Sequence, residues 1–134
     1  MTATDEPLSL LGDLVAKAKA AGAEAADAVH FSSTGLSHAQ RLGAPERLER
    51  DESQEVGLRV LLGKRQAIVS STDLARDSLE ELVERALAMA KVVPEDPYCG
   101  LAEAGQLASA VPALEILDAE EPAPEVLIER ARAC

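Results

Sequence analysis

The stretch that decides the fold is residues 56–71, VGLRVLLGKRQAIVSS. Its first half alternates, so that every second side chain lies on one side of an extended backbone: Val56, Leu58, Val60 and Leu62. This period of two predicts a strand with one buried face over residues 56–62.

A tight turn and a returning strand follow directly. Gly63-Lys64 fits a two-residue type II′ turn, because glycine accepts the positive φ that the first central position requires. Residues 66–71 then form a second strand, with Ala67 and Val69 on one face and Ile68 and Ser70 on the other. The stretch therefore predicts an antiparallel β-hairpin.

A helix is predicted after the break at Thr72-Asp73, from about Ala75 to Lys91. Apolar residues recur at helical spacing and form one stripe: Leu79, Leu82, Val83, Ala86, Leu87 and Ala90. Alanine is a poor N-cap, so a start at Asp77 or Ser78 stays open. Hairpin and helix together form a plausible core.

The chain before this core predicts one more helix and two or three more strands. Residues 8–21 read as an amphipathic helix with Gly22 after its end. Strands are predicted at 24–32 and 36–42, separated by the turn signal Ser33-Thr34-Gly35, and a charged edge strand at 47–53 follows the turn Gly43-Ala44-Pro45. The expected fold is α+β, two-layered, with one mostly antiparallel four- or five-stranded sheet. Two helices cover one face in the order α-β-β-β-β-α, and an irregular C-terminal tail follows.

Residues 1–93 are expected to form one domain, followed by a different kind of segment at 94–134. This segment is rich in proline and in acidic residues, among them Glu115, Asp118, Glu120 and Glu121. A new amphipathic helix begins at Glu125 and runs to Ala133. The pattern predicts a linker and the start of a further domain, so the chain is expected to be a fragment of a longer protein.

Charge and composition restrict the partners. The net charge of −11 argues against a nucleic-acid-binding surface and against adhesion to an anionic membrane. No apolar run approaches the roughly 18 residues of a membrane span, and residues 1–7 lack the features of a secretory signal. Two cysteines do not make a disulfide framework, so a cytoplasmic location is expected.

A search for chemistry assembles no active site. His30 and His38 could lie on neighbouring strands of one hairpin, but without further ligands they read as ordinary strand histidines. The junction at residues 70–73 could receive an anion, although a polar turn that starts a helix is the simpler interpretation. Cys99 has no neighbour that would make a catalytic thiolate, and the role of Cys134 stays open. No catalytic, cofactor-binding or metal-binding residue is predicted.

Five segments, in this order and spacing, resemble the N-terminal domain of the TldD/PmbA family, whose members are also labelled modulators of DNA gyrase. They are RLER at 47–50, VGLRV at 56–60, SSTDL at 70–74, LEELVERA at 79–86 and PEDPY at 94–98. The resemblance covers about residues 8–101, and residues 94–101 are more similar to the PmbA (TldE) branch. Ala75 departs from the Ser-Pro helix start of the family.

The resemblance implies a two-subunit cytoplasmic assembly that cleaves small or unfolded peptides. The TldD-type subunit carries zinc through an H-E-x-x-x-H motif downstream of this domain, and PmbA-type subunits lack that motif. No His is followed by Glu here, so no zinc ligand is carried over and the chain's status as an enzyme stays open. The resemblance implies a role in assembly and substrate containment, beside a TldD-like subunit or as a dimer with itself. Separately, the charged strand 47–53 is a candidate sheet edge for holding an extended peptide by strand addition, which needs no catalytic side chain. Two alternatives are a non-proteolytic regulatory module, such as a modulator of DNA gyrase, and, least favoured, a complete enzyme.

Overall fold

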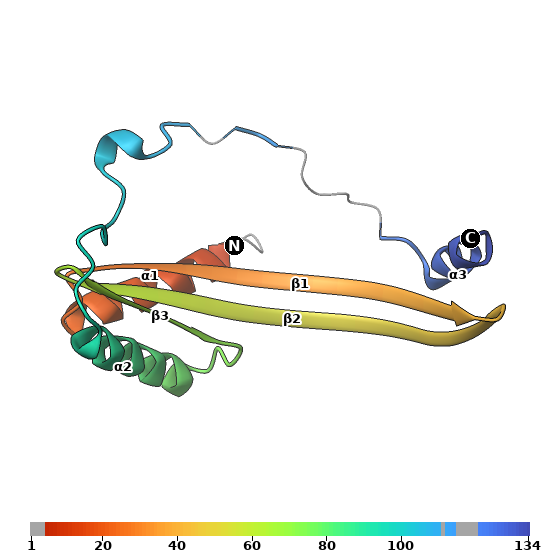
Figure 1. Cartoon of the computed structure of the whole chain (residues 1–134), viewed down its shortest axis with the longest axis horizontal. Helices are drawn as coiled ribbons and strands as arrows, with labels where there is room; N and C mark the ends of the chain where they lie inside the picture. The colour runs from red at the N-terminus through yellow and green to blue at the C-terminus, as the bar shows by residue number, and fades with distance from the viewer. Residues whose placement is uncertain (1–4, 111, 115–120) are drawn as a thin grey trace. The chain divides into compact units, whose positions relative to one another are not determined.

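The computed structural model describes residues 5–110, 112–114 and 121–134. Along the chain it contains α1 (Asp5–Ala20), β1 (Ala25–Arg41), β2 (Ala44–Leu62), β3 (Arg65–Ser71), α2 (Arg76–Val92), a short 3-10 helix (Ala104–Gln106) and α3 (Pro124–Arg132). The strands form one sheet in the order β1-β2-β3 (Figure 1). The α+β class is confirmed.

The hairpin of β2 and β3 forms as predicted. The two strands are antiparallel, with Leu58 opposite Val69 and Val60 opposite Ala67. Gly63 has a φ of 59°, whereas Lys64 is not among the residues with positive φ, which is the pattern of a type II′ turn. The local turn chemistry and the alternating pattern agree on one register, and this register brings the apolar side chains onto a common face.

The core lies between that face of the sheet and two helices. Val56, Leu58 and Val60 are fully buried on β2, and Figure 1 shows α2 running alongside β3. All six residues of the predicted α2 stripe are buried, and Leu14 and Ala18 of α1 join the same cluster. The apolar stripe of each helix is therefore what holds it on the sheet.

Among the residues that the structure describes, the sheet has three strands, so the prediction of four or five was wrong. The predicted strands at 24–32 and 36–42 are one strand, β1, which passes through the expected turn at Ser33-Thr34-Gly35. Pairing with β2 satisfies the backbone groups there and overrides the local turn preference. The charged segment 47–53 is likewise part of β2 and not a separate strand; its side chains are exposed as expected. The order is α-β-β-β-α-α.

The turn between β1 and β2 lies one residue earlier than predicted. Leu42 and Gly43 have φ values of 51° and 78°, the two positive values of a type I′ turn, and Ala44 begins β2. A left-handed backbone conformation costs a residue with a Cβ, such as Leu42, about 1–2 kcal/mol. The Leu42 side chain is 99% exposed.

The ends of α1 and α2 follow local rules. Gly22, with a φ of 112°, follows α1, and the Ala23 amide donates to the Ala18 carbonyl as in a Schellman cap. Ala75 is the N-cap of α2 and supplies no side-chain hydrogen bond, so the helix begins at Arg76 and not at Asp77 or Ser78.

The described chain divides into two compact units, and each unit contains part of the long strands β1 and β2. One contains residues up to 32 and 53–103, and the other contains 33–52 and the residues from 104 onward. The predicted helix at 125–133 is present as α3, and Gln40 donates to the Ile128 carbonyl at 3.0 Å within the second unit. Residue 111 and residues 115–120 of the predicted linker, with Glu115, Asp118 and Glu120, lie outside the described residues.

Candidate functional site

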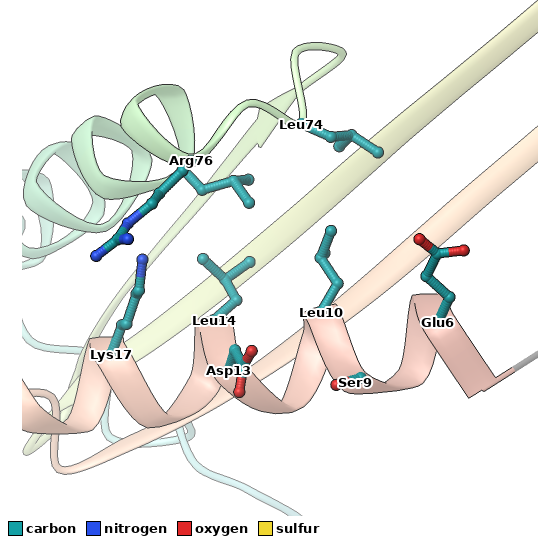
Figure 2. A pocket seen from close by; sticks show the side chains of 9 residues that line it. Glu6, Ser9, Leu10, Asp13, Leu14, Lys17, Leu74 and Arg76 are labelled. Carbon is teal, nitrogen blue, oxygen red and sulfur yellow. The ribbon is translucent and has the colours of Figure 1, made fainter. Parts of the chain in front are cut away.

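A groove of about 790 Å³ lies between α1 and the segment that leads into α2. Figure 2 shows Leu10 and Leu14 rising from α1 toward Leu74. Leu79 completes the apolar lining, and Glu6 and Asp13 line the groove from α1. Residues three and four apart on a helix share one face. For this reason α1 contributes six of the residues that line the groove: Glu6, Ser9, Leu10, Asp13, Leu14 and Lys17. The groove offers apolar contact and charge, and no nucleophile beside a base.

Ion pairs close one end of this groove. The Glu80 carboxylate accepts hydrogen bonds from Lys17 Nζ at 2.9 Å and from Arg76 Nε at 3.1 Å. These two cations, Lys17 first, hold the pKa of Glu80 below its usual range. Glu6 and Asp13 form no ion pair within the residues that the structure describes, so the other part of the rim keeps uncompensated negative charge.

The open edge of β2 is the second candidate site. β3 pairs with residues 56–62 of β2 only, so residues 44–55 have β1 on one side and no described strand on the other. Unpaired N–H and C=O groups along such an edge can add an extended peptide. This edge contains the charged segment 47–53 named from the sequence, and residues 44–55 carry five acidic and two basic side chains.

The 70–73 junction is held by hydrogen bonds of its own side chains. Asp73 accepts hydrogen bonds from the Ser78 hydroxyl at 2.6 Å and from the Ala75 amide at 2.9 Å. These bonds, the Ser78 bond first, lower the pKa of the Asp73 carboxyl. The junction is therefore a polar turn that leads into α2, as predicted.

The outer face of the sheet carries an ion pair that the sequence did not reveal. Arg59 on β2 donates to Asp27 on β1 through Nε at 3.1 Å and also through its terminal nitrogen. The hydrogen bond to Asp27 raises the pKa of Arg59 further, against the opposing effect of partial burial. Alternation along a strand does not reveal this pair, because only the pairing of β1 with β2 brings the two side chains within hydrogen-bonding distance.

Residues after α2 fold back onto the β2–β3 turn. The Asp96 amide donates to the Lys64 carbonyl at 2.8 Å, and Lys64 Nζ donates to the Cys99 carbonyl at 3.2 Å. Cys99 is 4% exposed, whereas Cys134 is exposed; both are free thiols. We call residues 94–99 the strap.

The two histidines lie on the same strand, so their expected placement on neighbouring strands was wrong. His30 and His38 are eight residues apart on β1, a separation of roughly 26 Å in an extended chain. Because β1 passes straight through residues 33–35, no hairpin brings them together. Both ring nitrogens of His38 are buried without a hydrogen-bond partner in the described structure.

The described residues do not fit a zinc ion. Zinc takes three or four ligands at one point. No group of three or more His, Cys, Asp or Glu side chains that could hold a metal occurs in 5–110, 112–114 and 121–134. In the same part of the chain, no helix is long and apolar enough to cross a membrane.

Comparison with known proteins finds one family domain and several relatives. Residues 26–90 match the model described as PmbA/TldA metallopeptidase domain 1. Metalloprotease PmbA of Escherichia coli O157:H7 is 32% identical over 117 residues, which is 87% of this chain and 25% of that protein. A metalloprotease PmbA homolog of Haemophilus influenzae is 36% identical over 101 residues, 75% of this chain and 22% of that protein. The chain thus spans about a quarter of the length of these curated relatives.

Two solved structures share the fold. A protein of Bacteroides thetaiotaomicron, described as a candidate modulator of DNA gyrase, superposes with a TM-score of 0.88 at 24% identity, over 98% of this chain and 30% of that chain. TldE of Thermococcus kodakarensis superposes with a TM-score of 0.72 at 17% identity, over 92% of this chain and 28% of that chain.

Proposed function

Because the chain belongs to the PmbA/TldD family through a first domain at residues 26–90, we propose that it is the N-terminal domain of a PmbA/TldE-like subunit. In this role it acts in assembly and substrate containment for a TldD/PmbA-type zinc metallopeptidase, in the cytoplasm, and does not itself break bonds. The observation that carries the proposal is the similarity to metalloprotease PmbA along most of this chain. The zinc is assigned to a TldD-like partner, whose substrates are small or unfolded peptides.

The open edge of β2 supports containment by strand addition. An unfolded peptide has free backbone N–H and C=O groups that can pair with residues 44–55. In a folded protein, most of these groups are already hydrogen-bonded. The excess of acidic over basic side chains on this segment favours peptides with Lys or Arg, and raised salt should weaken the preference. No catalytic side chain is needed for this mode of binding.

Peptidase activity tests the proposed role. A TldD-like protein from the same organism is assayed on an unfolded polypeptide with and without this chain, and the two proteins are run together on a sizing column. We expect co-elution and faster cleavage when the chain is present. Equal cleavage without co-elution would contradict the role, and binding to DNA gyrase in the absence of any TldD-like protein would favour the regulatory alternative.

Hydrogen exchange tests the mode of binding. Adding an unfolded peptide should slow exchange at every second amide of residues 44–55, because only alternate N–H groups face an edge. The folded form of the same polypeptide is the control and should protect none of them. Protection at consecutive amides, or none within 44–55, would rule out strand addition along β2.

A further inference from the structure

The groove between α1 and the start of α2 has ends of opposite charge. Glu6 and Asp13 are exposed on α1 and form no ion pair within the residues that the structure describes. At the other end, Lys17 and Arg76 share one carboxylate, that of Glu80, at 2.9 and 3.1 Å. One end is therefore net negative and the other net positive, and Figure 2 shows this order along α1 from Glu6 to Lys17.

Apolar side chains line the space between these ends. Leu14 and Leu79 are buried, whereas Leu10 and Leu74 are only half-buried and keep part of their surface open to the groove. Figure 2 shows Leu10 and Leu74 extending toward the same space, one from α1 and the other from the segment before α2. The volume of about 790 Å³ is in the range of pockets that hold a small ligand, so the groove has room for several side chains.

The spacing along α1 favours a helical occupant. Glu6, Leu10 and Asp13 follow one another at i, i+4 and i+7 on one face, so the two acidic residues are about 10 Å apart along the helix axis. A second helix lying along α1 repeats this period, and basic residues at the same spacing meet both carboxylates with an apolar residue between them. An extended peptide covers about 10 Å in about three residues, so its two basic side chains would point to opposite faces.

We propose that this groove binds a basic amphipathic helix of another protein, whose Lys or Arg side chains face Glu6 and Asp13. The apolar side chains of that helix pack on Leu10 and Leu74. It carries no basic residue beside Lys17, where it would meet like charge. The net charge of −11 attracts such a helix at long range and repels acidic ones. The proposal goes beyond the peptidase role, because it needs neither a TldD-like protein nor the open edge of β2.

Fluorescence anisotropy of a labelled synthetic helix, titrated with the 134-residue chain, tests the proposal. The peptide carries two lysines at the spacing of Glu6 and Asp13, with leucines between them on the same face. A scrambled peptide of the same composition is the control for charge alone. We expect saturable binding of the amphipathic peptide, about tenfold or more tighter than binding of the scrambled one, because only the first presents one apolar face. Raised salt should weaken it.

Matched variants of the chain locate the site. Leu10→Gln should weaken binding about tenfold, because it removes apolar contact at the centre of the groove. Asp13→Lys should weaken it about fivefold or more, because attraction becomes repulsion. Glu84→Lys makes the same charge change at an exposed residue of α2 outside the groove, and it should leave binding unchanged. Thermal melting of each variant shows that it folds.

A charge swap completes the test. A peptide with Glu in place of Lys should bind the double variant Glu6→Lys/Asp13→Lys more tightly than it binds the wild-type chain. Equal binding of the amphipathic and scrambled peptides, unchanged binding by Asp13→Lys, or a swap without recovery would each overturn the proposal. Loss of binding by Asp51→Lys with Asp13→Lys unaffected would place the peptide on the open edge of β2, and it would overturn the proposal as well.

Discussion

Replacing Leu58 by alanine tests which face of the sheet carries the core. Leu58 is 0% exposed in the part of β2 that pairs with β3, opposite Val69 and within the cluster that α1 and α2 cover. Removing its methyl groups loses their burial and leaves a cavity, which together cost about 3–4 kcal/mol at such a site. A small domain has about 5–15 kcal/mol of stability in all, so this variant should be close to its limit.

Urea unfolding followed by far-ultraviolet circular dichroism measures the effect. With a denaturant slope of about 1.5 kcal/mol per molar urea, the midpoint of unfolding should fall by about 2 M. The slope itself should not change, because the same surface becomes exposed.

Ile68→Ala is the matched control on the adjacent strand. Ile68 lies opposite Arg59 on the outer face and is 65% exposed, so its truncation should cost less than about 1 kcal/mol. If both variants lost the same stability, or Ile68→Ala lost more, the assignment of the buried face would be wrong.

Three further predictions concern single groups. The Ser78 hydroxyl and a backbone amide lower the pKa of Asp73, so its carboxylate stabilises the fold above its unfolded pKa of about 3.9 and ceases to do so as pH falls through the lower folded value. Asp73→Asn should therefore lower the melting temperature at pH 7, and the melting temperature of the variant should fall less steeply than that of the wild type between about pH 5 and pH 2. Melting temperatures that fall in parallel with pH for the two proteins would contradict this. In the native chain, Cys134 should react with a thiol reagent at once and Cys99 only slowly, and Lys64→Met, which frees the strap, should speed the slow phase; equal rates for the two thiols would show that the strap does not hold Cys99 in a buried position. Zinc at micromolar concentration should show no stoichiometric binding by calorimetry, because the two histidines are far apart on one strand, and a one-to-one isotherm would refute that placement.

Some features of the candidate sites are formed by residues close together in the sequence, and others by residues far apart. The Asp73 turn could be read from residues 70–73, because all its partners lie within five positions along the chain. The Arg59–Asp27 pair, the groove lined by Leu10 and Leu74, and the open edge of β2 each join residues far apart in sequence. None of them has a local signal.

Sequence patterns by themselves determined the elements whose causes are local: the β2–β3 hairpin with its Gly63 turn, the buried stripe of α2, and the amphipathic α1 and α3. Only the tertiary structure decided the number and length of the strands. The turn signal at residues 33–35 is real, but pairing along β2 gives that backbone the hydrogen bonds that a turn would have supplied. Strand pairing is a contact between distant segments, and a local pattern contains no record of which distant partner will be present.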